Sequence, residues 1–393
     1  MTAALRPPGV VAERVDAALF DLDRRIDWLT HVSPLDNHER WASFRDSGFS
    51  SCPPLTYPPF ELDVSGLAGE LDALPIGDVE QPTIAVLLSE KQRELRQFLT
   101  LLEARDTPAF AMASETLFGA TDPTLLDDAC EILETAPEEA PAGPDADADT
   151  VAAEAAAARD RYRAIAPDFD FEIRVVDDVD AAMMVHHGDL VIDSHISIPL
   201  PRVRALVAHE VGVHVVTRHN GRRQPLRLFE SGFADYDPLQ EGLATFCEYL
   251  AGCLPPTRLR TLAARVVAAD LALAQEPVEA IFAELRVHGI AERTAFDVAV
   301  RAKRGGGLTK DAVYLQGLHE LHAWLGDGGD ITQLFLGKYA LGQRHLMAEL
   351  LEDGFLEPPA ILPTCLTEPG ADERLASAVD TPFTRLYQLE TPA

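Results

Sequence analysis

Two segments constrain the fold more than any other part of the sequence: HEVGVH (209–214) and QEGLA (240–244). Together they supply two imidazoles and a carboxylate, which can hold Zn²⁺ and leave a fourth position open for water. His209, His214 and Glu241 are therefore the candidate ligands of one zinc ion per chain. They can bind it only if two helices that are separate in the sequence meet in space.

Glu210 lies beside the first candidate ligand and is the candidate general base. A glutamate next to a ligand on a helix can reach the activated water without binding the metal, as in the shorter HExxH motif. The alternative is a helix that carries two unrelated histidines on different faces. The QEGLA segment weighs against that alternative because it adds the missing ligand.

The spacing of the two histidines is one residue longer than in an HExxH helix. Positions five apart on a regular helix differ by about 140°, whereas positions four apart differ by about 40°. His209 and His214 would therefore diverge on a regular helix. We expect a π-bulge or widened turn near Gly212, a residue that tolerates unusual backbone geometry.

The composition is that of a globular protein, with 47% hydrophobic and 25% charged residues in 393. No apolar run approaches the roughly 18 residues needed to cross a bilayer. Residues 1–8 lack the apolar stretch of a secretory signal. Five scattered cysteines form no CxxC pair, which fits a reducing compartment. These features predict a cytoplasmic protein.

The formal net charge of −31 disfavours nucleic acid and membrane surfaces as partners. The stretch 201–227 is an exception, because it holds six arginines against the single acid Glu210: Arg202, Arg204, Arg218, Arg222, Arg223 and Arg227. One interpretation is an anionic ligand group, such as a free carboxylate on the substrate. The other is that these arginines neutralise the acidic body or lie on solvated faces.

Periodicity and composition predict an α+β fold that is predominantly helical. Three short strands are expected at 171–176, 183–185 and 190–198, the last two joined by a turn at 187–189. They would form a small sheet before the metal helix. Within it, Ser194–Ile198 is a candidate for an edge strand that aligns the substrate, with ordinary core β-structure as the alternative.

The metal helix is expected over 201–214, with its continuation ending at Asn220-Gly221, and the helix with Glu241 over 239–252. The proline-rich segment 52–60 should be extended. Further helices are predicted at 15–29, 83–102, 258–275, 278–285, 291–300, 311–325, 331–335 and 341–352. Four segments follow: a helical N-terminal region packing on the core (1–135), an acidic Pro/Ala linker or loop (136–150), a catalytic domain (151–366) and a C-terminal tail (367–393).

From about Val15 to Leu366 the chain resembles the QEGLA-motif family, described as flavohemoglobin expression-modulating, which is related to the microtubule-associated tyrosine carboxypeptidases (MATCAP). Besides HEVGVH and QEGLA, the resemblance is carried by residues 220–221, 224–226, 248–252, 304–306, 309–315 and 337–338. It implies a zincin-like metallopeptidase core whose eukaryotic relatives remove a C-terminal tyrosine from protein tails. His209, His214 and Glu241 would be the ligands and Glu210 the base.

The resemblance also includes an Arg-Gly-Gly stretch at 304–306, and the candidate substrate-binding residues there are Arg301, Lys303 and Arg304. A guanidinium there could bind the terminal carboxylate of a substrate, and the glycines would allow close approach. The alternative is a plain flexible turn.

Two further residues have candidate roles. Tyr314 could donate a hydrogen bond to the developing oxyanion, as zinc peptidases commonly require, or could be a packed core tyrosine. Glu248 lies two helical turns after Glu241, where it could accept the remaining N–H of a ligand histidine. Asp235 and Asp237 compete for that role.

The sequence thus predicts a zinc-dependent metallopeptidase, a carboxypeptidase that acts on C-terminal residues of peptides or protein tails. Glu210 would activate the attacking water. Two alternatives stay open: a zinc-containing regulatory or binding protein without hydrolytic activity, and a hydrolase of a non-peptide amide.

Overall fold

The structure is a computed structural model that describes residues 5–139, 143–177, 182–186 and 188–388. Its contacts divide the chain into two compact units. The first comprises Met1–Gly9, Glu139–Thr257 and Gly317–Ala393, and the second comprises Val10–Glu138 and Arg258–Gln316. Each unit is therefore assembled from segments that are distant in the sequence.

This division differs from the linear segmentation at 135, 150 and 366, because residues 258–316 group with the N-terminal helices. Composition along a chain reports local changes, whereas a unit is defined by contacts through space. Residues 140–142 of the expected linker lie outside the described residues. Its end is not a linker, since helix α8 begins at Ala148 with Asp147 as its N-cap.

A small three-stranded sheet lies in the first unit and precedes the metal helix, as predicted. It consists of β2 (Ile173–Val176), β3 (Met183–His186) and β4 (Asp189–Asp193). The strand order is β2-β4-β3, with β2 parallel and β3 antiparallel to β4. The strands β1 (Asp145–Ala146) and β5 (Ile198–Pro199) form a separate antiparallel pair. His187 of the expected turn lies outside the described residues.

The prediction of a strand at Ser194–Ile198 is wrong. The chain turns at Ser194 and His195, where the Asp193 side chain accepts a hydrogen bond from the backbone of His195. Side chains of this kind offer the backbone an alternative to the sheet. The strand that packs beside the metal helix is instead β3, which is an edge strand of the sheet.

Helices dominate the first unit, and several of them pack against the metal helix. The π-helix η2 continues α9, runs into α10, and packs against α8, α12, α18 and the strands β3 and β4. The helices are α8 (Ala148–Ile165), α9 (Leu200–Val207), η2 (Ala208–Val215), α10 (Val216–Arg223), α11 (Leu228–Ser231), α12 (Asp237–Leu250), η5 (Ile331–Phe335), η6 (Leu341–Gln343), α17 (Arg344–Glu352), α18 (Thr364–Thr367), α19 (Ala371–Asp380) and η7 (Phe383–Arg385). The expected tail therefore contains α19, which packs on α12.

All the regular secondary structure among the described residues of the second unit is helical. It contains α1 (Val10–Ile26), α2 (Trp28–Val32), α3 (Asn37–Asp46), α4 (Val64–Asp72), η1 (Ile76–Asp78), α5 (Pro82–Glu103), α6 (Ala109–Phe118), α7 (Pro123–Thr135), α14 (Val278–Val287), α15 (Glu292–Lys303), η3 (Arg304–Gly306) and η4 (Lys310–Ala312). The division between the two units falls within helices α13 (Pro256–Leu273) and α16 (Val313–Gly326). The segment 52–60 has no regular structure, as its prolines predict.

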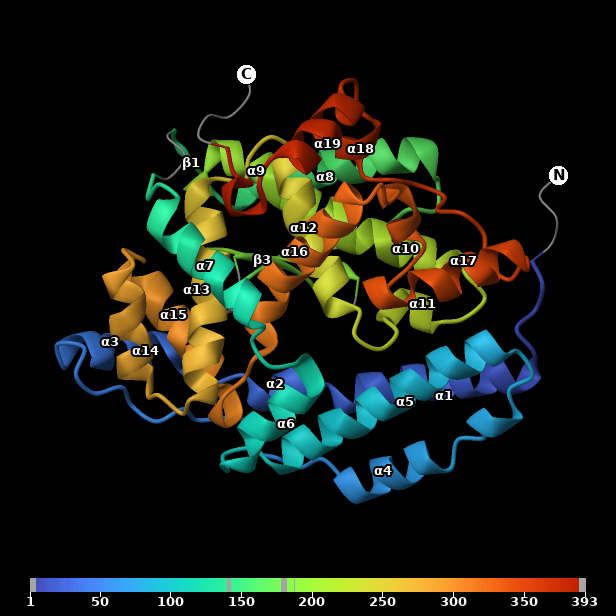
Figure 1. Cartoon of the computed structure of the whole chain (residues 1–393), viewed down its shortest axis with the longest axis horizontal. Helices are drawn as coiled ribbons and strands as arrows, with labels where there is room; N and C mark the ends of the chain where they lie inside the picture. The colour runs from blue at the N-terminus through green and yellow to red at the C-terminus, as the bar shows by residue number, and fades with distance from the viewer. Residues whose placement is uncertain (1–4, 140–142, 178–181, 187, 389–393) are drawn as a thin grey trace. The chain divides into compact units, whose positions relative to one another are not determined.

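Glycines hold α12 close to α16, and Figure 1 shows the two helices side by side. A Cβ on Gly242 would lie 2.4 Å from the backbone of Gly317, and one on Gly317 would lie 1.7 Å from the carbonyl oxygen of Pro238. Any side chain at these positions would force the helices apart. The glycine of QEGLA thus fixes the packing of the helix that carries Glu241.

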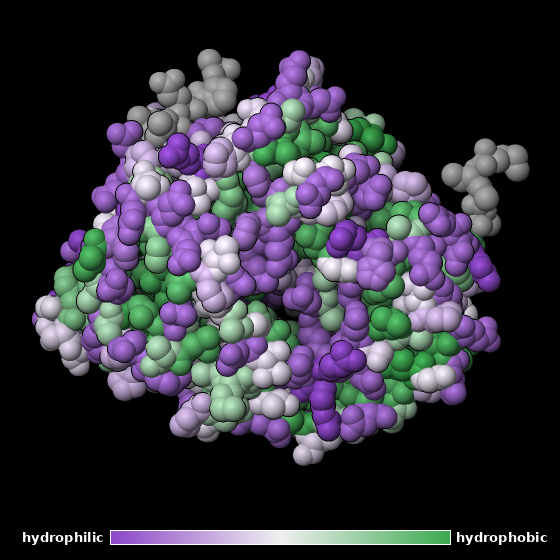
Figure 2. Space-filling view, viewed as in Figure 1, coloured by the Kyte–Doolittle hydropathy of each residue, from purple (hydrophilic) through white to green (hydrophobic). Residues whose placement is uncertain are grey.

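Among the described residues, no helix is both long and apolar enough to span a membrane. On the face shown in Figure 2, hydrophobic and hydrophilic residues are interspersed. Single exposed apolar residues of this kind are normal on protein surfaces.

Candidate metal centre

The widened turn expected between the two histidines is confirmed. Residues Ala208–Val215 form a π-helix, η2, between the α-helices α9 and α10. The rings of His209 and His214 lie with their centroids 5.1 Å apart and their planes at 77°. The hydrogen bonds of a π-helix join residues five apart, whereas those of an α-helix join residues four apart. A spacing of five residues therefore places both imidazoles on one side of the helix.

Gly212 is not strained in this turn. It is absent from the glycines with positive φ, and a Cβ there would meet the Tyr162 hydroxyl at 3.6 Å, an ordinary contact. The widened turn therefore does not depend on a conformation available only to glycine.

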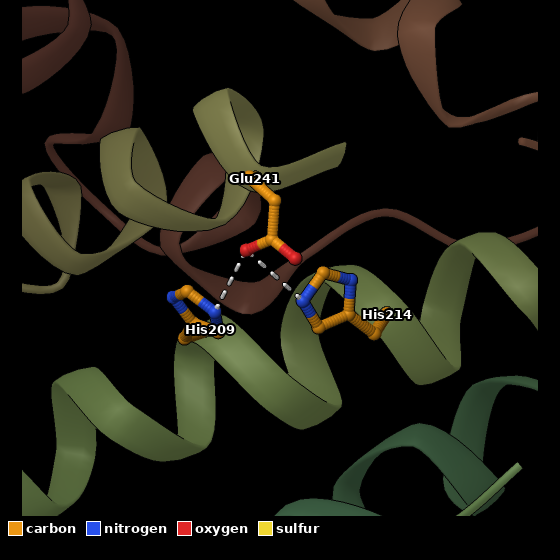
Figure 3. A group of neighbouring side chains, drawn as sticks. All are labelled: His209, His214 and Glu241. Atoms are coloured by element: carbon orange, nitrogen blue, oxygen red, sulfur yellow. Dashed lines mark ion pairs between the residues drawn. The ribbon is translucent and has the colours of Figure 1, made fainter. Parts of the chain in front are cut away.

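Glu241 extends from α12 between the two imidazoles (Figure 3). Its Oε2 lies 3.6 Å from Nε2 of His209 and 4.0 Å from Nε2 of His214. The potential ligand atoms of the three residues all lie within 4.8 Å of one another. Two ligands of a tetrahedral zinc are separated by about 3.3 Å, since zinc binds nitrogen and oxygen at about 2.0–2.2 Å. Small side-chain movements would therefore suffice to fit the ion, and the donor set suits it.

Glu210 is buried beside this group. Its Oε2 accepts a hydrogen bond from the backbone N–H of Val185 on β3 at 3.2 Å, and its Oε1 lies 3.9 Å from Nε2 of His209. Burial raises the pKa of Glu210 to about 7; His209 opposes this rise and Glu241 adds to it. The carboxyl group is thus held in place and is easily protonated, as a group that accepts and returns a proton must be.

Glu248 is fully buried and contacts the Nδ1 atom of the His209 ring. Its Oε1 lies 2.9 Å from Nδ1 of His209, and its Oε2 accepts a hydrogen bond from Arg202 at 2.7 Å. Burial would lower the pKa of His209, but the hydrogen bond to Glu248 and the nearby carboxylates raise it overall. The contact leaves Nε2 of His209 directed at Glu241, the orientation that a metal ligand requires.

The arginines of 201–227 mostly pair with acids of the same unit. Arg202 pairs with Glu248, Arg204 with Glu368, Arg218 with Glu230, and Arg223 with Asp168 and Glu357. Four of the six are therefore neutralised internally, which favours the second interpretation of this strip over an anion-binding surface.

The candidate substrate-binding residues all lie in the second unit. Arg301 donates two hydrogen bonds to the buried Asp311, at 2.5 and 2.7 Å. Lys303 is half-buried, and burial lowers its pKa. Arg304 is buried at the start of η3. The binding of a substrate carboxylate by these three residues stays a prediction.

The glycine loop that follows them is packed rather than open. The N–H of Gly305 donates to the Tyr57 hydroxyl at 2.7 Å, and its carbonyl accepts from the backbone of Asp106. Its φ is +62°, and a Cβ there would meet the Phe110 ring at 2.3 Å. Close packing against the Phe110 ring is therefore a sufficient reason for a glycine at this position.

Tyr314 lies in the first turn of α16, in the part that belongs to the second unit. The guanidinium of Arg265 lies over its ring, 4.6 Å from the centroid. Its role as an oxyanion donor stays a prediction.

Sequence reasoning gave no structural role to two residues at the end of the metal helix, Asn220 and Gln224, although both belong to the stretches that carry the family resemblance. Asn220 donates to the carbonyls of Phe335 and Ile361 and accepts from the backbone of Ala360 and Ile361. Gln224 binds the backbone of Glu357 in the same way. Both residues fasten the C-terminal segment to the end of the metal helix. A buried side-chain amide can satisfy two backbone groups at once, but the sequence does not show which amides are buried.

A buried carboxylate next to two converging imidazoles and a second carboxylate is consistent with a zincin-like HExxxH site in a mostly helical fold. The profile of the microtubule-associated tyrosine carboxypeptidase family matches residues 42–380. The chain therefore belongs to this family, which confirms the resemblance, and membership implies a metallocarboxypeptidase. No curated protein sequence matches the chain.

Proposed function

We propose that this protein is a zinc-dependent carboxypeptidase that releases residues from the C-terminus of peptides or protein tails. The observation that carries the proposal is the convergence of His209, His214 and Glu241 beside the buried Glu210, within a family of carboxypeptidases. His209, His214 and Glu241 would hold one Zn²⁺. When bound, the ion supplies Lewis acidity that activates water and polarises a carbonyl group.

The residues of the chain supply the proton transfers. Glu210 accepts a proton from the attacking water and returns it to the amine that leaves. Its hydrogen bond from Val185 fixes one oxygen, so the other faces His209 and the reacting groups. Glu248 keeps Nδ1 of His209 engaged, so that its Nε2 stays available.

Strand β3 is a suitable place for the substrate backbone. It is an edge strand, and one of its amides already contacts the general base. An extended peptide that pairs with such an edge has its carbonyl groups held in register. β3 therefore takes the substrate-aligning role that the sequence assigned to Ser194–Ile198.

The family description points to tyrosine as the residue released. Peptides that end in tyrosine are accordingly the first substrates to test. The net charge of −31 repels an acidic tail at long range, so association with such a tail should accelerate as salt screens the charge.

The first experiment measures bound metal by elemental analysis and incubates the same preparation with a mixed peptide library, with cleaved positions read by mass spectrometry. We expect one zinc per chain and the loss of single C-terminal residues. Glu210→Gln should retain zinc and lower kcat about 10²–10⁴-fold, the usual contribution of a general base.

Glu154→Gln is the matched control, because it removes a partly exposed carboxylate that pairs with Arg161 in the same unit. It should cleave at the wild-type rate. If Glu210→Gln cleaved peptides at that rate, Glu210 would not be the general base. Stoichiometric zinc with no released amino acid would favour a regulatory or binding protein, and internal cleavage would show an endopeptidase.

A further inference from the structure

Two side chains of the metal helix, which comprises α9, η2 and α10, contact the β3–β4 hairpin. The carboxylate of Glu210 on η2 accepts a hydrogen bond from the N–H of Val185 on β3. Eight residues later, on α10, the guanidinium of Arg218 lies against Gly188 in the turn between the strands. Eight helical residues span about 12 Å, and three residues of chain span up to about 10 Å. The two contacts are therefore spaced similarly on both elements.

Arg218 packs closely against the turn. A Cβ on Gly188 would lie 2.2–2.5 Å from Cζ, Nη1 and Nε of Arg218, so any side chain at position 188 would displace the guanidinium. Gly188 also has a φ of +95°, a conformation that favours glycine. Nη2 of Arg218 pairs with Oε1 of Glu230 on α11 at 2.6 Å, and the arginine side chain is only 22% exposed. The guanidinium thus contacts the turn and α11 together.

The outer edge of β3 presents the backbone of Met183 and Val185. The carbonyl of Ala182 accepts a hydrogen bond from the N–H of Asp193, so these two residues form a hydrogen-bonded pair of the antiparallel ladder. Such pairs alternate along a ladder, so the backbone groups of Met183 and Val185 point away from β4. The bond from Val185 to Glu210 agrees with this alternation. A peptide that pairs with the edge would therefore meet both backbone groups of Met183 and the carbonyl of Val185.

A peptide paired with this edge can be aligned only if the strand keeps its place beside the metal ligands. The hairpin is short, with four residues in β3 and five in β4, so few backbone hydrogen bonds hold it. Arg218 suits the task, because a planar guanidinium can pack against backbone while it pairs with a carboxylate. Stability alone does not require the arginine, since a partly exposed ion pair contributes little.

We infer that Arg218 is a positioning residue, which holds the edge strand β3 in place beside the metal ligands through its contact with the β3–β4 turn. The inference rests on the proposed function, because it concerns the strand that would align the peptide. Arg218 does not touch the reacting groups and acts only through the turn. It thereby gains a role different from both interpretations of the basic stretch 201–227, which were an anionic ligand and charge neutralisation.

The test compares an N-acylated dipeptide that ends in tyrosine with a pentapeptide that extends the same two residues by three alanines. Only the pentapeptide has enough backbone to pair with β3, so the wild-type KM should be lower for it. Arg218→Met removes the guanidinium and should raise the KM of the pentapeptide about 3- to 10-fold, as for the loss of roughly one hydrogen bond. The kcat of both peptides should stay unchanged, because pairing holds substrate and transition state alike.

The difference between the two peptides separates positioning from a structural role. Loss of a residue that only stabilises the fold would affect both peptides alike, whereas Arg218→Met should keep the wild-type zinc content and the wild-type KM of the dipeptide. Arg218→Lys should recover part of the lost affinity for the pentapeptide, because an ammonium group can still pair with Glu230. Glu230→Gln should raise the same KM by less, and should add little to Arg218→Met, since both variants loosen one contact.

Arg223→Met is the matched control. Arg223 also lies on α10, but it pairs with Asp168 and Glu357, which lie outside the hairpin. This variant should have the wild-type KM for both peptides.

The outcomes distinguish this inference from the proposed function. Cleavage by wild-type protein, together with an Arg218→Met variant whose KM is unchanged or rises equally for both peptides, would overturn the inference alone. Absence of any cleavage by zinc-loaded wild-type protein would overturn the proposed function. In that case, the affinities of the two peptides for wild-type and Arg218→Met protein, measured by fluorescence anisotropy, decide the inference. An unchanged affinity for the pentapeptide would refute it.

Discussion

The cluster around His209 and the cluster around Asp311 both gather charged side chains, but the charges that surround the central residue have opposite signs. Three carboxylates surround His209 in the first unit: Glu210, Glu241 and Glu248. In the second unit, three guanidiniums surround Asp311: Arg301, Arg265 and Arg304. Proteins rarely bury uncompensated charge without a reason, because it weakens the fold.

The two imidazoles and the carboxylates of the first cluster offer the donor atoms that a divalent cation needs. In the second cluster, Asp311 itself balances part of the surrounding positive charge. The comparison also predicts which residues the fold itself needs. These are Asp311 and Glu248, the acids that hold each cluster together.

The largest expected effect on stability comes from Asp311→Asn. This change removes the charge of the buried carboxylate that accepts two hydrogen bonds from Arg301 and lies near Arg265 and Arg304. It should destabilise the protein by about 3–5 kcal/mol, as for other broken buried ion pairs. Urea denaturation followed by circular dichroism would measure the loss.

Arg301→Met is the informative companion. It leaves Asp311 beside Arg265 and Arg304, so it should destabilise the protein less than Asp311→Asn does. Equal losses in the two variants would show that Asp311 stabilises the protein through Arg301 alone and that Arg265 and Arg304 contribute nothing.

A smaller effect is expected on metal affinity from Glu248→Gln. The variant weakens the hydrogen bond that orients His209, and such partners typically contribute about 10- to 100-fold to metal affinity. A competition titration of zinc against a chelator would measure it. Glu368→Gln, which removes the partner of the half-exposed Arg204, should bind zinc as the wild type does. An unchanged affinity in Glu248→Gln would mean that packing alone orients the imidazole.

The histidine spacing shows how far local geometry can be predicted from sequence. A separation of five residues cannot place two ligands on one face of an α-helix, so a widened turn follows from helix geometry alone. Strand existence was also predictable, because β2, β3 and β4 are short apolar runs. Their boundaries were not, since the turn at Ser194 depends on the Asp193 side chain.

The remaining features depend on contacts between distant residues. In the sequence, Arg202 is one of six arginines in a basic stretch. Its pairing with Glu248, 46 residues later, is seen only in the structure. Arg265 lies in an ordinary amphipathic helix, where an arginine suggests a solvated face. Likewise, the glycine of QEGLA could be recognised as conformationally free, but its packing against Gly317 requires knowledge of how α12 and α16 pair.

The smallest predicted effect is the acid dependence of stability in the second unit. Burial would raise the pKa of Asp311, but the charges of Arg301, Arg265 and Arg304 and the hydrogen bonds from Arg301 hold it well below its usual range. A folded-state pKa below the unfolded value of about 3.9 means that the stabilisation is fully present above that pH and is lost as pH falls toward the folded pKa. Below pH ~4, the free energy of unfolding of the wild-type protein should therefore fall by up to about 1.4 kcal/mol per pH unit more than that of Asp311→Asn.

Denaturation curves at successive pH values would show the stabilities of the two proteins converging as pH falls. The control is Asp297→Asn, at the half-exposed pair with Arg293, whose stability should depend on pH as that of the wild type does. Parallel slopes for wild type and Asp311→Asn would mean that the arginines around Asp311 do not hold its charge in the folded state.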